Sequence, residues 1–150
     1  MAIKKIRTEY DNPMYVETER KLNEIGKGMC LAKWTQVTLQ LQTGHNHSCH
    51  HPRTHKINTK EIARNPSALH NTQYKKMRRR EMLTGKRPVE CDYCWNVEDN
   101  SDRFSDRTFK SNESWSKPHF DEIVNADWRE NINPRYVEVA FSNACNFKCS

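Results

Sequence analysis

The sequence predicts a small α+β protein in which a β-hairpin and a helix surround a bound metal and a further strand follows. Three observations support this fold class. Residues 37–43 (VTLQLQT) alternate between apolar and polar side chains, as a half-buried strand does. Residues 66–84 have a helical pattern that Gly85 is placed to end. Six cysteines occur among 150 residues of which only 35% are hydrophobic, so a metal or disulfides are expected to supplement a small core.

The N-terminal part is expected to be an arm followed by a helix. Residues 1–13 form the arm, with a short strand at Ile3–Ile6. Residues 14–26 have a helical pattern, and Gly26 is placed to end that helix.

A β-hairpin is expected next. In the strand at residues 37–43, the alternate residues from Val37 to Leu41 share one side, which is expected to face the core. Residues 44–46 (GHN) supply a turn, and a short return strand is expected to carry Cys49.

The central helix is predicted to run from Pro66 or Asn71 to Thr84, and Gly85 is placed to end it. The basic run at residues 75–80 (KKMRRR) is expected to form a solvated face near the negative end of the helix dipole. Nucleic-acid contact through this run is the alternative. The residues expected to form the apolar stripe of the helix are Leu69, Tyr74, Met77 and Leu83.

The C-terminal third is expected to contain a loop, a helix and a strand. Residues 96–117 are polar and are predicted to form the loop. The helix is predicted to start at Ser116 or Pro118 and to end at about Arg129. The strand is predicted at residues 135–141 (RYVEVAF), and the residues on one of its faces are Val137, Val139 and Phe141.

Charge and the N-terminal sequence limit the classes of function. The net charge is +6 and the isoelectric point is about 9.1, which permits a polyanionic partner without requiring one. No glycine-rich phosphate-binding motif occurs. The start, MAIKKIRTEYDN, lacks the apolar region of a signal peptide, and no run approaches roughly 18 apolar residues. We therefore expect a cytoplasmic protein with no membrane contact, whose cysteines bind metal rather than form disulfides.

Four cysteines are candidates for one metal site. Cys91 and Cys94 form a CxxC turn, which can aim two sulfurs at one metal, whereas structural zinc and iron–sulfur centres usually need four ligands. Cys30 and Cys49 flank the hairpin, whose ends lie side by side, and the central helix is expected to bring the CxxC back to the same point. Thioredoxin-like redox chemistry and unrelated buried thiols are the other interpretations of these cysteines.

A histidine-rich segment, GHNHSCHHPRTH, surrounds Cys49. One histidine could replace a thiolate and convert the site into a zinc site. Alternatively, the imidazoles line a polar loop or form hydrogen bonds to the sulfur atoms. We expect at most one ligand among the five histidines His45, His47, His50, His51 and His55.

Two more cysteines, Cys145 and Cys149, form a CxxxC directly after the last predicted strand. Two further residues and a cysteine would complete CxxxCxxC. In that motif three thiolates hold three irons of a 4Fe-4S cluster, and the open fourth iron can bind S-adenosylmethionine.

Together these features resemble the radical SAM family. RYVEVAFSNACNFKCS looks like the first strand and cluster loop of a radical SAM enzyme. The segment from Cys30 through GHNHSCHHP to LHNTQYKKMRRREMLTGKRPVECDYCW resembles the SPASM/twitch module, in which a hairpin cysteine, a helix and a CxxC surround an auxiliary 4Fe-4S cluster. Some radical SAM proteins carry a twitch module ahead of the core, and this chain looks like that arrangement.

The resemblance implies a set of ligands and a division of the chain. The implied ligands of the auxiliary cluster are Cys30, Cys49, Cys91 and Cys94, and the implied first two ligands of the SAM-binding cluster are Cys145 and Cys149. The implied segments are an N-terminal arm and helix (1–27), a twitch-like domain (28–98), a linker and helix (99–133) and the first strand of an incomplete radical SAM β/α barrel (134–150).

The function that the resemblance implies is that of an N-terminal fragment of a radical SAM enzyme. The complete enzyme would reductively cleave S-adenosylmethionine and abstract a hydrogen atom through the resulting 5′-deoxyadenosyl radical. Its expected partners are a peptide or small-molecule substrate and a reductant such as flavodoxin or ferredoxin. The 150-residue chain is expected to hold no catalytic residue and to be inactive alone.

Two other function classes stay open. The first is a zinc-stabilised nucleic-acid-binding module that uses the same four cysteines, or one histidine in place of a cysteine, together with the basic helix. The second is a zinc-bearing HNH-type nuclease, in which GHNHSCHHP supplies a catalytic histidine and a metal ligand. The nuclease needs a compact ββα hairpin, which the long helix between Cys49 and Cys91 fits poorly.

Overall fold

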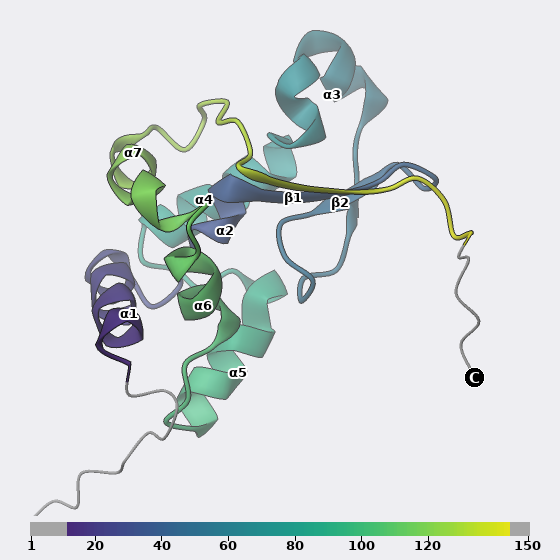
Figure 1. The fold of residues 1–150 in the computed structure, drawn as a ribbon. Helices are drawn as coiled ribbons and strands as arrows, with labels where there is room; N and C mark the ends of the chain where they lie inside the picture. Colours follow the sequence, from purple (N-terminus) through teal and green to yellow (C-terminus); the bar gives the residue numbers. More distant parts are fainter. Residues whose placement is uncertain (1–11, 145–150) are drawn as a thin grey trace, which may run out of the picture.

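A computed structural model describes residues 12–144 of the chain as an α+β fold, which confirms the predicted class. Most of the helices gather around one end of a small sheet, and the other end of the sheet projects away from them (Figure 1). The arm predicted before residue 12 lies outside the described residues. In chain order the elements are α1 (Pro13–Ile25), α2 (Ala32–Thr35), β1 (Gln36–Gln40), β2 (His45–His47), β3 (His55–Lys56), α3 (Thr59–Arg64), η1 (Pro66–Leu69), α4 (Gln73–Leu83), η2 (Val89–Cys91), α5 (Asp92–Asn100), α6 (Asp106–Asn112), η3 (Lys117–His119), α7 (Phe120–Asn125) and β4 (Tyr136–Ala140).

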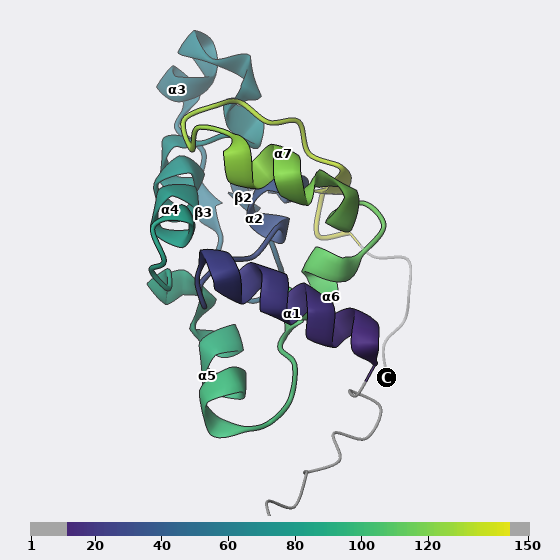
Figure 2. The same cartoon turned by 90° about the vertical axis from the view of Figure 1, so that its left-hand side faces the viewer.

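The helix α1 confirms the first predicted helix. Its N-cap is Asn12, whose side chain accepts a hydrogen bond from the Met14 N–H at 3.0 Å. The helix ends at Gly26, as the sequence predicts. It packs against α6 (Figure 2), and the Thr18 hydroxyl donates to the Asn112 side-chain oxygen at 2.9 Å across this contact.

The predicted β-hairpin is confirmed, with two differences in detail. β1 pairs antiparallel with β2, and the turn residue Gly44 has a φ of +69°, a conformation that favours glycine. β1 is shorter than predicted and Leu41 is 50% exposed, because the last carbonyl of β1 already accepts the Gly44 N–H at 2.9 Å. β2 ends at His47, so Cys49 follows the return strand instead of lying in it.

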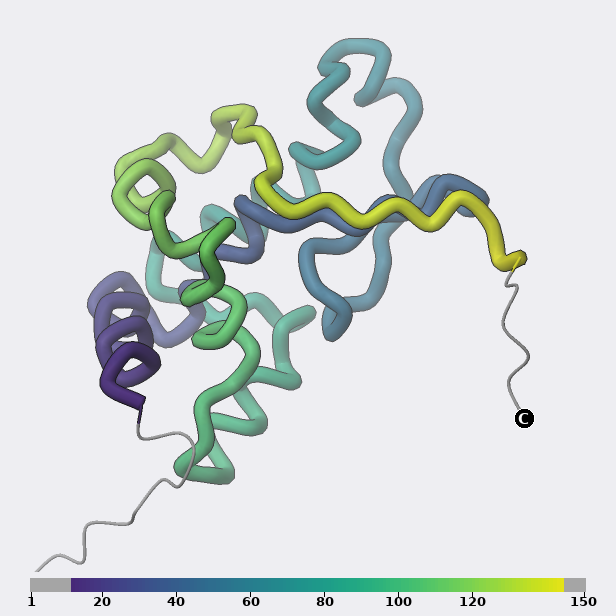
Figure 3. The backbone as a smooth tube through the Cα atoms, viewed as in Figure 1, coloured from purple at the N-terminus to yellow at the C-terminus, as the bar shows by residue number. Residues whose placement is uncertain are grey.

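The sheet has the strand order β3-β2-β1-β4, and β4 confirms the last predicted strand. β4 runs parallel to β1, so segments 100 residues apart lie side by side (Figure 3). The Thr38 hydroxyl donates to the Glu138 carboxylate at 2.7 Å across this pairing. β4 forms an edge of the sheet, and the apolar side chains in it and directly after it are exposed: Val137 by 51%, Val139 by 39% and Phe141 by 75%.

The helix α4 confirms the central helix, but its predicted apolar stripe is only partly correct. Gly85 ends the helix with a φ of +77°, as expected. Leu69 and Tyr74 are 43% and 40% exposed, whereas Met82 is buried. Leu83 of the predicted stripe packs against the core, whereas the middle of α4 faces α2 and the start of β1 through two long basic side chains.

Those basic side chains, Lys75 and Arg79, are buried, so the predicted solvated face is wrong for these two residues of the basic run, whereas Arg80 is exposed. The Lys75 ammonium donates to the Gln36 carbonyl at 3.1 Å. The Arg79 guanidinium donates to the Lys33 carbonyl at 3.1 Å and to the Asn71 side chain at 2.7 Å. Backbone carbonyls and the Asn71 side-chain oxygen thus supply the acceptors that let two basic side chains leave water.

The loop predicted at residues 96–117 is wrong, because α5 and α6 occupy most of it. Some of their polar side chains pair with each other instead of facing water. The Arg107 guanidinium donates to the Glu98 carboxylate at 2.7 Å, and these side chains are only 1% and 10% exposed. A polar segment can form helices in this way although its sequence has no apolar pattern that predicts them.

The helix predicted to end at about Arg129 is shorter in the structure. η3 and α7 together end at Asn125, and the next residue, Ala126, is extended with a φ of −75° and a ψ of 147°. The buried contact that α7 contributes is Ile123. Residues beyond Ala126 therefore form a connection to β4 rather than further helical turns.

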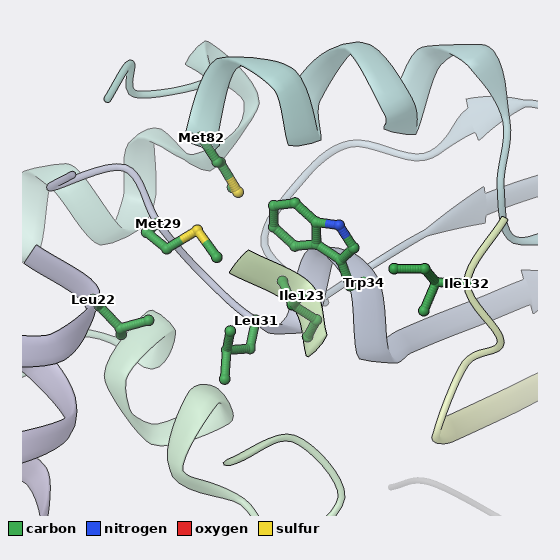
Figure 4. Packing of buried hydrophobic residues seen from close by; sticks show 7 residues of the cluster. All are labelled: Leu22, Met29, Leu31, Trp34, Met82, Ile123 and Ile132. Carbon is green, nitrogen blue, oxygen red and sulfur yellow. The ribbon is translucent and has the colours of Figure 1, made fainter. Parts of the chain in front are cut away.

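The hydrophobic core is small and lies where α1, α2, α4 and α7 meet (Figure 4). Among the described residues, no helix has the combination of length and apolar character that crossing a bilayer requires. The buried residues of the core are Leu22, Met29, Leu31, Trp34, Met82, Ile123 and Ile132.

Candidate metal centre

The four upstream cysteines come from three separate parts of the fold. Cys30 lies in the connection between α1 and α2, and Cys49 follows β2. Cys91 ends η2, and Cys94 lies in the first turn of α5. None of the four forms a disulfide.

A close backbone approach fixes the connection that carries Cys30. A Cβ atom on Gly28 would lie 2.0 Å from the Lys86 carbonyl oxygen, and one on Gly26 would also meet backbone, at 2.6 Å. Glycine allows this contact because it has no Cβ. The contact holds Cys30 near the segment that leads from α4 into Cys91.

One cavity collects the four cysteines. Cys145 and Cys149 lie outside the described residues, so their role stays a prediction. The cysteines that line the cavity are Cys30, Cys49, Cys91 and Cys94.

Burial raises the pKa of all four thiols. The pKa of Cys30 rises to about 12 and that of Cys94 to about 11. For Cys30 the next causes after burial are the charges of Cys94, Cys49 and Cys91, so the four sulfur atoms lie within electrostatic reach of one another. The thiols are therefore protonated at neutral pH, and a metal ion would displace these protons on binding.

Hydrogen-bond donors surround the sulfur atoms. Each donor lowers the pKa of the thiol that it contacts, and so opposes the effect of burial. Such donors also tune the properties of thiolate-bound iron–sulfur clusters. They are the backbone N–H groups of Ala32, His51 and Arg107, the Ser105 hydroxyl and the Lys33 ammonium.

The wall of the cavity carries a positive charge at Lys33. This side chain forms an ion pair with Glu90, and the Tyr74 hydroxyl donates to the same carboxylate at 2.8 Å. Burial lowers the pKa of Lys33, but the charges of Cys91 and Glu90 outweigh burial and the net change is upward. Lys33 is therefore charged at neutral pH and lies beside the Cys91 sulfur.

Two histidines adjoin Cys49. Within residues 12–144, the one group of three possible ligands whose atoms all lie within 4.8 Å of one another is Cys49, His50 and His51. Burial and the neighbouring charge of His51 lower the pKa of His50, which favours the neutral imidazole that binds metals. The other histidines of the segment form hydrogen bonds to backbone or hydroxyl oxygens: His45, His47 and His55.

The spacing of the cysteines bears on the kind of metal. Four thiolates on one zinc ion lie about 3.8 Å apart, given Zn–S bonds of about 2.3 Å in a tetrahedron. No three of the four described cysteines lie within 4.8 Å of one another. The four thiols are thus farther apart in this structure than the ligands of a single zinc ion.

Sequence reasoning missed several residues of the cavity. The sequence could have indicated Lys33, because it lies three residues after Cys30 and so about one helical turn away. Nothing in the sequence indicated Asp106 and Arg107, because they line the cavity only once α6 has folded back across it. Both belong to the segment that composition alone predicts to be a loop.

The cavity lined by the four cysteines is the candidate functional site of this chain. It combines four thiols with His51, Asp106 and three basic side chains, a set that suits a soft or borderline metal. No protein-family model, curated protein or solved structure gives a significant match to this chain.

Proposed function

We propose that the four-cysteine cavity holds a 4Fe-4S cluster, and that the chain is the N-terminal part of a radical SAM protein with a twitch-type auxiliary module. The observation that carries this proposal is the presence in one cavity of four cysteines from three distant segments. The motifs around these cysteines, described above, support the choice of family. The proposed ligands are Cys30, Cys49, Cys91 and Cys94.

The residues of the cavity fit such a cluster. Four thiolates are its usual ligand set, and the cysteines lie farther apart than a single zinc ion needs. When bound, the cluster supplies a one-electron redox centre. Lys33 and Arg107 offset part of the negative charge that four thiolates bring into the cavity.

The ligand set also limits what the proposed cluster does. Because the protein supplies all four ligands, no iron is left open to bind substrate. The role that we propose is therefore to carry electrons or to brace the fold. Bracing is consistent with a hydrophobic core as small as the one described here.

The second part of the proposal concerns Cys145 and Cys149 as the first two ligands of a SAM-binding cluster. Both follow β4, which is parallel to β1 and exposes Val137 and Phe141. Strands of parallel sheets are usually covered on both faces, which supports a larger sheet around β4 in the complete protein. The proposed partners are a peptide or small-molecule substrate and a flavodoxin or ferredoxin, in the cytoplasm.

Anaerobic reconstitution with iron and sulfide tests the first part. The wild-type chain is expected to become brown, to bind about four irons and four sulfides, and to give an electron paramagnetic resonance signal on reduction. Cys30→Ser and the double variant C91S/C94S are expected to lose most of this iron. His119→Ala is the control, because His119 pairs with Glu122 and does not line the cavity. Colourless protein with a single zinc ion would contradict the cluster.

The second part has its own measurement. The reconstituted 150-residue chain, supplied with dithionite and S-adenosylmethionine, is expected to form no 5′-deoxyadenosine, because the sequence holds only two of the three cysteines of the motif. Turnover by this chain would show that the SAM site is not built as proposed.

A zinc-stabilised module is the second candidate function, and one observation favours it. Cys49, His50 and His51 already lie within 4.8 Å of one another, close to the spacing that a zinc ion needs. The nucleic-acid part of this candidate is weakened, because Lys75 and Arg79 of the basic run are buried. Retention of zinc, together with salt-dependent binding to a mixed-sequence DNA duplex, would favour this function.

A further inference from the structure

Two adjacent imidazoles lie close to one carboxylate at the rim of the cavity. The Nε2 atom of His51 lies 2.5 Å from Oδ2 of Asp106, and the Nε2 atom of His50 lies 3.3 Å from the same oxygen. A carboxylate accepts hydrogen bonds, so His51 presents its Nε2–H to Asp106, whereas His50 lies within ion-pair distance of the same oxygen. On both rings Nδ1 is the other nitrogen.

The sulfur of Cys49 lies on that other side. Its distance from Nδ1 of His50 is 3.9 Å, which approaches the separation of an S and an N ligand on one metal ion. The three ligand atoms of Cys49, His50 and His51 lie within 4.8 Å of one another. One sulfur and one nitrogen of each imidazole thus lie close together, with the Asp106 carboxylate near both rings.

Aromatic contacts fix the rings in this arrangement. Tyr93 stacks on His51 with ring centroids 3.7 Å apart and an interplanar angle of 12°. The centroids of His50 and His51 lie 4.0 Å apart. Since Tyr93 stands inside the CxxC turn, the orientation of His51 depends on the same turn that positions Cys91 and Cys94.

We propose that Cys49, His50 and His51 bind a single divalent ion of the zinc class, and that Asp106 is the positioning residue for the His51 imidazole. A ring N–H held by a carboxylate is the usual outer-shell partner of a metal-bound histidine. The side chain of His50 is 60% exposed, so this group of ligands is open to solvent on the His50 side. Three protein ligands with an open fourth position are typical of reactive rather than purely structural zinc sites.

The site shares Cys49 with the four-cysteine set. One thiolate cannot complete both sets as a terminal ligand, so occupation of one excludes full assembly of the other. This exclusion rests on the proposed function, whereas the mixed site itself does not. An iron-loaded chain is therefore expected to bind no further divalent ion at His50 and His51.

Titration of the metal-free chain with Co²⁺ under anaerobic conditions tests the proposal. Wild-type protein is expected to bind one ion, with a thiolate-to-cobalt charge-transfer band and the visible bands of a four-coordinate ion. The double variants C91S/C94S and C30S/C91S, which disable the four-cysteine set, are expected to keep this binding. C49S and H50A/H51A are expected to lose it, and H119A is the matched control that keeps it. Circular dichroism shows whether each variant is folded.

The role of Asp106 has a separate readout. D106A is expected to weaken Co²⁺ binding by about 10–100-fold, the usual effect of removing an outer-shell partner. D106E is expected to restore part of the affinity, since it restores the carboxylate. An equal loss in both variants would assign Asp106 a structural role and overturn this assignment.

Two outcomes would overturn the mixed site. One is cobalt binding that survives in H50A/H51A but disappears in both double cysteine variants, which would place the ion on the four cysteines. The other is no cobalt binding by the folded wild-type chain. The proposed cluster is judged separately, because H50A/H51A keeps all four of its cysteines and should still take up iron and sulfide.

Discussion

Lys33 and Glu90 form an ion pair at the wall of the cysteine cavity, with side chains that are 3% and 9% exposed. The pair joins α2 to η2, which are the elements that follow Cys30 and carry Cys91. Each partner has a second contact, since Lys33 lies beside the Cys91 sulfur and Glu90 accepts from the Tyr74 hydroxyl. The cavity thus contains a fixed charge before any metal binds.

Removing one partner of this pair is expected to destabilise the fold. Lys33→Met leaves Glu90 with an unpaired charge, which costs roughly 3–5 kcal/mol for a buried pair, and the Tyr74 hydrogen bond keeps the cost near the lower limit. The double variant K33M/E90Q is expected to lose less, because no charge remains. Urea unfolding of the wild type and the variants measures these differences. R20M, which breaks an exposed pair with Glu17, is expected to have little effect.

Stability is expected to fall as the solution becomes acidic. Burial, and then the charge of Lys75, lower the pKa of His55 from 6.5 to about 4, and the same causes lower that of His70. The unfolded chain therefore takes up protons first, and stability decreases from pH 6.5 down to about pH 4. His55→Gln is expected to flatten this decrease, because Gln can bond to Thr72 without titrating. Urea midpoints across this range test it, and parallel curves would contradict the assignment.

The close approach at Gly28 makes a prediction that separates stability from metal binding. Gly28→Ala places a Cβ 2.0 Å from the Lys86 carbonyl, and overpacking of this kind costs about 1–3 kcal/mol. Because the displaced connection carries Cys30, iron uptake is expected to fall as well.

Gly44→Ala is the matched control for this substitution. It imposes about 1–2 kcal/mol of strain through its φ of +69°, but a Cβ there meets no atom within 4 Å. Iron uptake is expected to stay normal in G44A. Equal iron content in the two variants would show that the Gly28 contact does not position the ligand.

Removal of the metal is expected to loosen the fold. A ligand that binds only the native state adds about 2.7 kcal/mol of stability at a concentration 100 times its dissociation constant. The iron-loaded chain should therefore unfold at a higher temperature than the chelator-treated chain. C91S/C94S should show no difference between the two treatments. A metal-free chain as stable as the loaded one would mean that the centre does not brace the fold.

Local patterns predicted the elements whose limits depend on local chemistry. The hairpin follows from the alternation around Val37 and from a turn that contains Gly44. The end of α4 follows from Gly85, since a positive φ there is a property of a single residue. The spacing of the cysteines likewise predicted a shared site, although the cavity that they line depends on the whole fold.

The wrong predictions, which placed basic side chains in solvent, share a different cause. Lys75 and Arg79 are buried because backbone carbonyls at the end of a distant helix and at β1 accept their hydrogen bonds. Arg107 is buried because Glu98 lies on the preceding helix. In each case the hydrogen-bond acceptor or carboxylate that stabilises the buried basic group comes from a separate element of the tertiary structure. Composition alone therefore assigns these residues to solvent.

The parallel pairing of β1 with β4 has a consequence for how the chain folds. The hairpin needs only neighbouring residues and can close early, whereas Thr38 meets Glu138 only after 100 further residues have been made. During translation β1 therefore keeps an unpaired edge throughout the synthesis of α3 to α7. Such edges are templates for pairing with other chains. The slow step of folding is thus expected to be the arrival of the last strand, and a chaperone or high dilution should matter most during that interval.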